Sequence, residues 1–260
     1  MVYRIRNAAL AALCLMLCVW LACVPVLAQS SQWYSAHVKD HQRPPVDGAL
    51  SYVTKYDGYY IGADEQDKVI YLTFDAGYEN GNVAKVLDVL KQKQVPAAFF
   101  VLSHLIEQNT DLVTRMSDEG HMVCNHTAHH KDMSKIADRA SFEAELKALE
   151  DICLKKTGRE MAKYYRPPEG KFSESNLQHA KELGYSTIFW SFAYADWDNE
   201  KQPSVETAKQ KILSNVHPGE VMLLHPTSAT NAAVLGEVID QCRAMGYRFG
   251  TLHELTERTR

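Results

Sequence analysis

The sequence lacks several features that would mark a specialised role. Beyond residue 28 its only cysteines are Cys124, Cys153 and Cys242, with no CxxC spacing. Neither a disulfide framework nor a cysteine metal site is therefore supported, and we expect three small buried apolar residues. No basic cluster or arm stands out, and the formal net charge is −4 at pH 7. This charge pattern disfavours a nucleic-acid partner and an anionic membrane surface.

Charge is also missing from a long apolar stretch near the N-terminus. Arg4 and Arg6 precede an uncharged run over residues 7–28, which ends in Val-Leu-Ala. Small residues at that spacing suit signal peptidase, so we expect 1–28 to be a signal peptide. The protein would then be secreted, or held at the cell wall or the outer face of the membrane. An uncleaved membrane anchor is the alternative, because ~20 apolar residues can span a bilayer.

The rest of the chain has an ordinary globular composition. The sequence has 260 residues, of which 46% are hydrophobic and 23% charged, so one domain with a large core is expected. Residues 29–66 show little periodicity and are expected to form an N-terminal extension that packs over the core. Residues 67–260 alternate between β-rich and amphipathic segments. Strands are predicted at 69–74, 97–102, 121–124, 164–166, 185–190, 220–225 and 248–251, and helices at 82–94, 110–119, 141–157, 173–183, 204–216 and 231–245.

This alternation has crossovers long enough for parallel strand pairing, which is typical of an α/β barrel or a doubly wound sheet. The first predicted strand ends at Asp75, in a turn that also carries Glu79, Gly77 and Gly81. Carboxyl ends of strands hold the chemistry in α/β folds, and glycines allow tight turns. Asp75 is therefore a candidate catalytic residue, although a capping role at a strand–helix junction is the alternative.

Histidines follow the third predicted strand. His126 and His130 stand four residues apart, with His129 between them. On one helical turn, side chains at this spacing share a face and can bind one metal ion. Surface or capping histidines are the alternative interpretation, and His129 is ambiguous.

A rigid turn follows the fourth predicted strand. Arg166 precedes Pro167 and Pro168, which fix the backbone, and Glu169 carries the next N–H group. Such a turn can aim that N–H at a developing oxyanion. A turn with a surface arginine is the alternative.

Two further clusters follow the next strands. Residues 190–198 combine Trp, Phe and Tyr with Asp196 and Asp198, a mixture that suits sugar recognition but also fills protein cores. His225 follows four apolar strand residues and could serve as a general acid, although a lone histidine in that place is more often structural.

Together and in this order, the five clusters resemble the polysaccharide deacetylases of the NodB-homology type, carbohydrate esterase family four. The resemblance covers residues 68–260. The variant Thr-Phe-Asp-Ala-Gly-Tyr-Glu-Asn-Gly at 73–81, with Phe-Trp-Ser at 189–191 and Leu-Leu-His at 223–225, is most similar to the delta-lactam-biosynthetic de-N-acetylases of spore-forming bacteria. The resemblance implies a distorted (β/α) barrel of about seven parallel strands.

It also implies roles for single residues. Asp75 matches the general base, Arg166 the residue that orients it, and Asp196 the residue that tunes the acid His225. The backbone N–H of Glu169 matches an oxyanion donor. His126 and His130 match metal ligands, and the substrate pocket is expected to include Trp197, Leu223, Tyr78 and Pro167.

One departure from the family pattern affects the metal. The family's usual second Asp, an anionic ligand, is Ala76 in this sequence. We therefore expect a weakly bound divalent ion, with Zn²⁺, Co²⁺, Mn²⁺ and Ni²⁺ not distinguished. Pro226 and Glu169 also differ from the residues common at these positions in relatives, and both differences weaken the assignment of a single substrate.

The implied function is removal of N-acetyl groups from peptidoglycan amino sugars. The first candidate substrate is N-acetylmuramic acid. After a wall amidase has removed the peptide, its freed amine would close the muramic delta-lactam of spore cortex. The alternatives are an N-acetylglucosamine or chitin-type deacetylase and a non-catalytic wall-binding protein, which the loss of a ligand at Ala76 would suit. A glycosidase with Asp75 and Asp196 as its carboxylate pair is a weaker alternative.

Overall fold

The computed structural model describes residues 30–258, so the predicted signal peptide or anchor lies outside the described residues. Among the residues that are described, no helix is both long and apolar enough to cross a membrane. The predicted domain boundaries near residues 28 and 66 stay predictions.

Eight strands form one sheet, and every pairing within it is parallel. The hydrogen-bonded order is β10-β3-β4-β5-β6-β8-β2, and β9 also pairs with β3. The strands are β2 (Gly58–Tyr59), β3 (Val69–Ala76), β4 (Ala98–Val101), β5 (Met122–Asn125), β6 (Ala162–Tyr165), β8 (Ser186–Ile188), β9 (Glu220–Leu224) and β10 (Arg248–Phe249). Just beyond β8, Phe192 pairs with Met222 of β9, so the sheet curls back on itself. The predicted distorted barrel of about seven parallel strands is confirmed.

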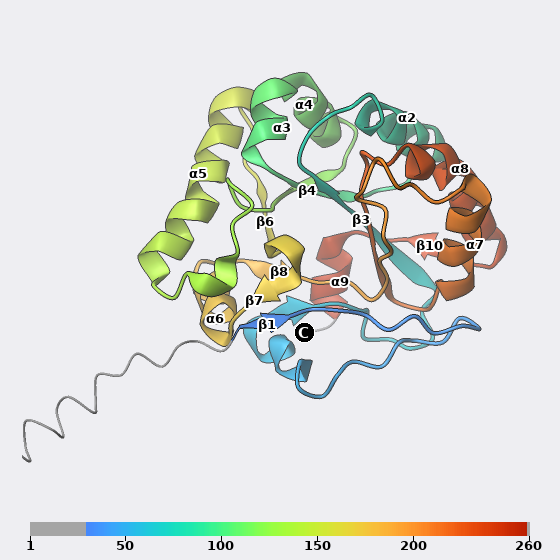
Figure 1. Ribbon diagram of the computed structural model, residues 1–260, viewed down its shortest axis with the longest axis horizontal. Coiled ribbons are helices and arrows are strands. Elements are labelled where there is room, and N and C mark those ends of the chain that lie inside the picture. Colours follow the sequence, from blue (N-terminus) through green and yellow to red (C-terminus); the bar gives the residue numbers. More distant parts are fainter. Residues whose placement is uncertain (1–29, 259–260) are drawn as a thin grey trace, which may run out of the picture.

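Most helices lie around the outside of this sheet (Figure 1). The helices are α2 (Val83–Lys93), α3 (Ser103–Gln108), α4 (Thr110–Asp118), α5 (Arg139–Thr157), α6 (Glu174–Glu182), α7 (Val205–Asn215), α8 (Ala229–Ala244) and α9 (Leu252–Arg258). Each predicted helix appears, and no end differs from its predicted position by more than two residues. The short helix α3 was not predicted, because a six-residue helix between two apolar segments leaves little periodicity.

The pleat of the strands sorts apolar side chains into two buried layers. In β3, Ile70 and Leu72 face the outer layer beneath the helices, whereas Val69 and Tyr71 face the barrel interior. Leu252 and Leu255 of α9 join the inner layer. Because side chains alternate along a strand, Asp75 falls on the inner side, at the carboxyl end of the barrel. Cys124, Cys153 and Cys242 are free and buried, as predicted.

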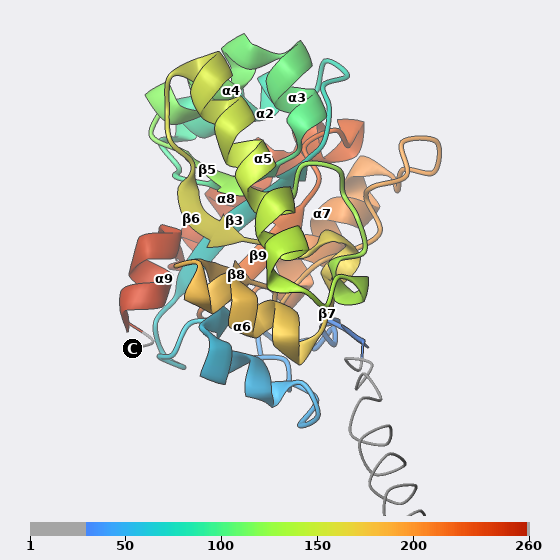
Figure 2. The ribbon, with the colours of Figure 1, turned by 90° about the vertical axis from the view of Figure 1, so that its left-hand side faces the viewer.

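The N-terminal segment contributes to the barrel and to its edge. Its strand β1 (Ser31–Gln32) pairs antiparallel with β7 (Lys171–Phe172), and β2 pairs with β8. The 3₁₀ helix η1 (Ser51–Tyr56) contacts α6, and Figure 2 shows this blue segment lying along the lower edge of the molecule, beneath α6. Residues 30–66 thus bring Gln32 and Trp33 next to the turn that follows β6.

Candidate active site

A cleft of about 700 Å³ opens at the carboxyl ends of the strands. Its walls come from the loops after β3, β4, β5, β6, β8 and β9 and from the N-terminal segment. The lining residues are Gln32, Trp33, Asp75, Gly77, Tyr78, Leu102, His126, His130, Glu169, Gly170, Trp190, Ala193, Tyr194, Trp197, Leu223, His225 and Thr227. Most of the residues selected from the sequence therefore converge on one cavity.

Asp75 lies on the floor of this cleft and is held by a buried arginine. Arg166 is fully buried, and its Nη1 donates to Asp75 Oδ1 at 2.8 Å. The rest of the guanidinium donates to Thr73 Oγ1 and to the carbonyls of Ile188 and Phe189, at 2.9 to 3.2 Å. Four of its five N–H groups are thus engaged, which fixes the guanidinium and orients the Asp75 carboxylate.

The charges around Asp75 decide its protonation state. Burial raises the pKa of this carboxyl, but the charge and hydrogen bond of Arg166, with the charge of His225, outweigh burial and bring the pKa below its ordinary value. Asp75 is therefore an ionised carboxylate at neutral pH, which is the form that a general base requires.

His126 and His130 come together in a loop. The prediction that they share one face of a helical turn was wrong. The residues after β5 are irregular, and Thr127 and His130 have positive φ values of 71° and 53°. Asn125 Oδ1 accepts the N–H of Thr127, and Thr127 Oγ1 accepts the N–H of His130. These bonds fold the loop so that the two imidazole centroids lie 5.0 Å apart.

The orientation of His126 is fixed from behind. Its Nδ1 lies 2.9 Å from the carbonyl oxygen of Arg166, so Nδ1 carries the proton and Nε2 faces Asp75 Oδ2 at 3.6 Å. Burial lowers the pKa of His126 to about 4. The imidazole is therefore neutral at pH 7, with a free lone pair on Nε2. His129 instead bonds to Glu145 outside the cleft.

His225 faces the cleft from the other side and is paired with buried Asp196. Its Nδ1 donates to Asp196 Oδ1 at 2.7 Å, and its backbone N–H donates to Oδ2 at 2.8 Å. Burial lowers the pKa of His225, but the bond and charge of Asp196, with the charge of Asp75, outweigh burial and raise it. The ring is thus held with Nδ1 protonated and in a more basic state than a free histidine, as a proton donor requires.

The remaining selected residues separate into two groups. Tyr78, Trp197, Leu223 and Glu169 line the cleft, and Trp197 lies edge-on to His225 at 6.3 Å. Pro167 is buried and is absent from the cleft wall, so its assignment to the substrate pocket is not supported by its position. It fixes the backbone between Arg166 and Glu169, whose φ of 55° is left-handed.

Sequence reasoning missed several lining residues. Gln32 and Trp33 belong to the N-terminal segment, where Gln32 Nε2 donates to the Glu169 carbonyl and Trp33 Nε1 to the Trp190 carbonyl. Gly170 has a positive φ, and a Cβ on it would meet Trp190 at 2.8 Å. The turn Arg166–Gly170 is thereby held against the cleft, and nothing in the two-residue strand β1 signals this in the sequence.

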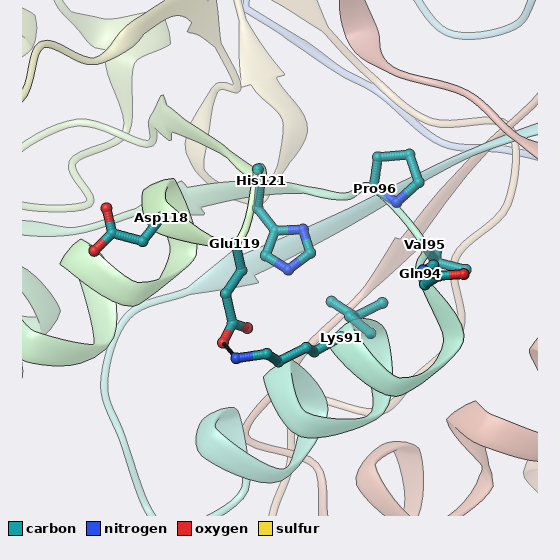
Figure 3. Close-up of a pocket in the computed structure, with 9 residues that line it drawn as sticks. Lys91, Gln94, Val95, Pro96, Asp118, Glu119 and His121 are labelled. Carbon is teal, nitrogen blue, oxygen red and sulfur yellow. Dashed lines mark hydrogen bonds and ion pairs between the residues drawn. The ribbon is translucent and has the colours of Figure 1, made fainter.

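A second hollow, of about 530 Å³, lies at the opposite end of the sheet, before β4 and β5 (Figure 3). Its charged groups are already engaged, since Glu119 Oε1 binds Lys91 and Arg115. His121 is buried there, and neither of its ring nitrogens reaches solvent or a partner. The acidic and basic side chains of this hollow are thus held in surface ion pairs, whereas the first cleft offers Asp75 and His225.

Comparison with known proteins agrees with this geometry. A family model described as polysaccharide deacetylase matches residues 62–188. Peptidoglycan-N-acetylmuramic acid deacetylase PdaA of Bacillus subtilis is 41% identical over 225 residues, which are 86% of this chain and 84% of that protein. The chain belongs to the polysaccharide deacetylase family.

Other members of the polysaccharide deacetylase family are also similar to this chain. The structure of Bacillus subtilis PdaA, a family 4 carbohydrate esterase, superposes with a TM-score of 0.85 at 38% identity, and the match covers 89% of this chain and 99% of that one. A peptidoglycan-N-acetylglucosamine deacetylase of Bacillus cereus is 32% identical over 215 residues, or 81% of this chain and 76% of that protein. The barrel and its edge segments are thus those of this family.

The polysaccharide deacetylase family is generally metal-dependent, and the donors in this cleft fit such an ion only in part. His126 and His130 offer two imidazoles, a donor type that suits Zn²⁺ and similar ions. Among residues 30–258 no group of three His, Cys, Asp or Glu side chains is arranged to hold a metal. Ala76 supplies no ligand, and its side chain is buried in the outer layer beneath the helices.

Proposed function

We propose that this protein removes the acetyl group from N-acetylmuramic acid in peptidoglycan. The observation that carries the proposal is the convergence of Asp75, Arg166, His126 and His225 on one sugar-sized cleft in a member of this family. The substrate follows the activity for which the Bacillus subtilis relative is named, and the match covers most of both chains.

In the proposed reaction Asp75 takes a proton from a water molecule in the cleft. The water oxygen attacks the acetyl carbonyl carbon, and the backbone N–H of Glu169 stabilises the resulting oxyanion. His225 then gives its proton to the amide nitrogen, the C–N bond breaks, and acetate and a free amine leave. His126 and His130 would hold a divalent ion, which supplies polarisation of the carbonyl when bound.

The size of each contribution can be bounded. A positioned base accelerates such a reaction by ~10²–10⁴-fold, and one oxyanion donor contributes about 3–4 kcal/mol. Because only two imidazoles are in place for a metal, Asp75 and the oxyanion donor supply more of the rate than in a site with three protein ligands. We propose that the ion is weakly bound and exchanges among Zn²⁺, Co²⁺, Mn²⁺ and Ni²⁺.

We further propose that the peptide-free form of muramic acid is the substrate, because only a free lactyl carboxyl can close a lactam with the new amine. A wall amidase that removes the peptide would act upstream. Such a substrate places the protein outside the cytoplasmic membrane, in agreement with a signal peptide or anchor over residues 1–28. A role in the spore cortex follows from the delta-lactam.

N-acetylglucosamine is the second candidate substrate, because the Bacillus cereus relative is named for it. A non-catalytic wall-binding role is motivated by Ala76, but Asp75, Arg166 and His225 all keep the geometry of a working site. A glycosidase would need Asp196 as an accessible partner of Asp75, and Asp196 is fully buried against His225.

The test is acetate release by the purified protein from peptidoglycan with intact peptide stems and from peptidoglycan stripped by an amidase. Mass spectrometry of the products separates the substrates, because loss of acetyl together with water from muramic acid marks a lactam. Loss of acetyl from glucosamine alone would favour the second substrate. Glycan binding without acetate release, with and without added divalent metal, would refute catalysis.

A further inference from the structure

A buried side-chain amide lies directly behind the Asp196–His225 pair. Asn231 is 1% exposed and does not line the cleft. Its Nδ2 donates to Asp196 Oδ2 at 2.6 Å and to the carbonyl oxygen of His225 at 3.1 Å. One amide therefore contacts the carboxylate that holds the imidazole and the backbone of the histidine itself.

The orientation of this amide is determined by its surroundings. Both Nδ2 hydrogens meet acceptors, whereas Asn231 Oδ1 accepts a hydrogen bond from the hydroxyl of Tyr194. A flipped amide would place its oxygen against the Asp196 carboxylate and the His225 carbonyl, where no hydrogen is available. The network Tyr194–Asn231–Asp196–His225 thus has a single satisfied arrangement.

The backbone of Asn231 is anchored as firmly as its side chain. Asn231 is the third residue of α8, and its N–H donates to Oγ of the capping residue Ser228 at 3.0 Å. The Ser228 hydroxyl in turn bonds to Gln202, in the loop that follows Asp196. The first turn of α8 therefore fixes the position from which the amide reaches Asp196.

We infer that Asn231 is a positioning residue for the proposed reaction. Its amide fixes the Asp196 carboxylate relative to the backbone of His225, so that His225 presents a protonated ring to the leaving nitrogen. This inference rests on the proposed function. The groups that face His225 are Asp196, Asp75 and Arg166, and only the Asp196 contact passes through Asn231. The charge balance of the cleft is otherwise untouched, because Asn231 is neutral.

The test replaces Asn231 with leucine, which has a similar shape and no donor. A hydrogen bond to a charged group is strong enough that kcat should fall about tenfold to hundredfold. KM should stay nearly unchanged, because Asn231 does not line the cleft. The less firmly held Asp196 stabilises the imidazolium less, so the alkaline limb of the pH profile should move about one unit to lower pH.

Asn176→Leu is the matched control. Asn176 is the third residue of α6, is also 1% exposed, and bonds through its N–H to the capping residue Ser173 and through Nδ2 to the Ile136 carbonyl. Its replacement should lower stability in the same way and leave kcat and the pH profile unchanged. Equal changes in both variants would reduce Asn231 to a structural residue and overturn the inference.

Asn231→Asp gives a second readout. It places a carboxyl against Asp196. When both carboxyls are ionised they repel each other and the donor to Asp196 is lost, whereas one shared proton restores a donor. Activity should therefore be lowest in alkaline solution and partly regained as the pH falls. The imidazole of His225 can also be titrated by NMR without any substrate, in wild type and in Asn231→Leu. An unchanged midpoint in the variant would overturn the positioning role. If the midpoint falls in Asn231→Leu as expected but wild type releases no acetate, only the proposed function is refuted.

Discussion

Replacement of Arg166 by methionine is the most informative test of how the site is built. Arg166 is fully buried, and it donates to Asp75, Thr73 and two backbone carbonyls and lies over the ring of Phe100 at 4.2 Å. Removal of one partner from a buried ion pair costs about 3–5 kcal/mol, because the other charge is left uncompensated. At about 2–4 °C per kcal/mol for a chain of this size, Tm should fall by roughly 6–20 °C.

The dependence of this loss on pH follows from Asp75. Its pKa in the folded protein is below the ordinary value, so the pair stabilises the fold above the unfolded-state pKa and loses that effect as pH falls through the folded-state pKa. The difference in unfolding free energy between wild type and Arg166→Met should therefore be largest at neutral pH and shrink below about pH 4.

Urea unfolding followed by circular dichroism across this pH range measures the effect. Arg115→Met is the control, because Arg115 makes ion pairs with Asp88 and Glu119 on the outer surface of α4 and should cost about 1 kcal/mol or less. If Arg166→Met were as stable as wild type at neutral pH, or if its deficit did not shrink in acid, the description of a buried, pH-sensitive pair would be incorrect.

Three further outcomes are expected. His225→Gln should lower kcat by ~10²–10⁴-fold and abolish the alkaline limb of the pH profile, which in wild type lies above the ordinary histidine range because Asp196 raises the pKa of His225; a retained limb would assign the acid elsewhere. Trp197→Ala should raise KM by about twofold to tenfold with Tm unchanged, because Trp197 is 61% exposed and an aromatic contact contributes about 0.5–1.5 kcal/mol; an unchanged KM would remove it from the substrate site. In equilibrium dialysis, wild type should bind Zn²⁺ weakly and a variant with both His126 and His130 replaced by alanine should not; equal binding would place the metal elsewhere.

Much of the fold could be predicted because its parallel strands are buried on both faces. The run from Val69 to Phe74 is apolar without alternation, which is what a strand between two packed layers requires. Asp75 then falls at the carboxyl end, where polar groups can reach a ligand. Chemistry-bearing residues that directly follow such strands, including Arg166 and His225, could therefore be found from the sequence.

Features that depend on contacts between distant parts of the sequence could not be predicted. Ser31 and Gln32 carry no strand pattern, and their pairing with β7 depends on a partner about 140 residues away. The spacing of His126 and His130 suggested a helix, whereas side-chain bonds and positive φ values shaped a loop instead.

The beginning of α8 shows a signal that was present in the sequence and was passed over. The helix was predicted from Asn231, but it begins at Ala229 behind the capping Ser228. A serine three residues before a polar helix position is a recognised helix start. With that boundary, Asn231 would have been placed in the first turn, next to the end of β9 and close to His225.

The most direct measurement of the central claim is acetate release by Asp75→Asn from peptide-free peptidoglycan. Asparagine keeps the shape of the side chain and an oxygen for Arg166, so the far-UV spectrum should match wild type while turnover falls by ~10²–10⁴-fold. Asp151→Asn, which changes an exposed carboxylate on α5 outside the cleft wall, should keep wild-type turnover. Wild-type turnover in Asp75→Asn would contradict the assignment of Asp75 as the base at the floor of this cleft.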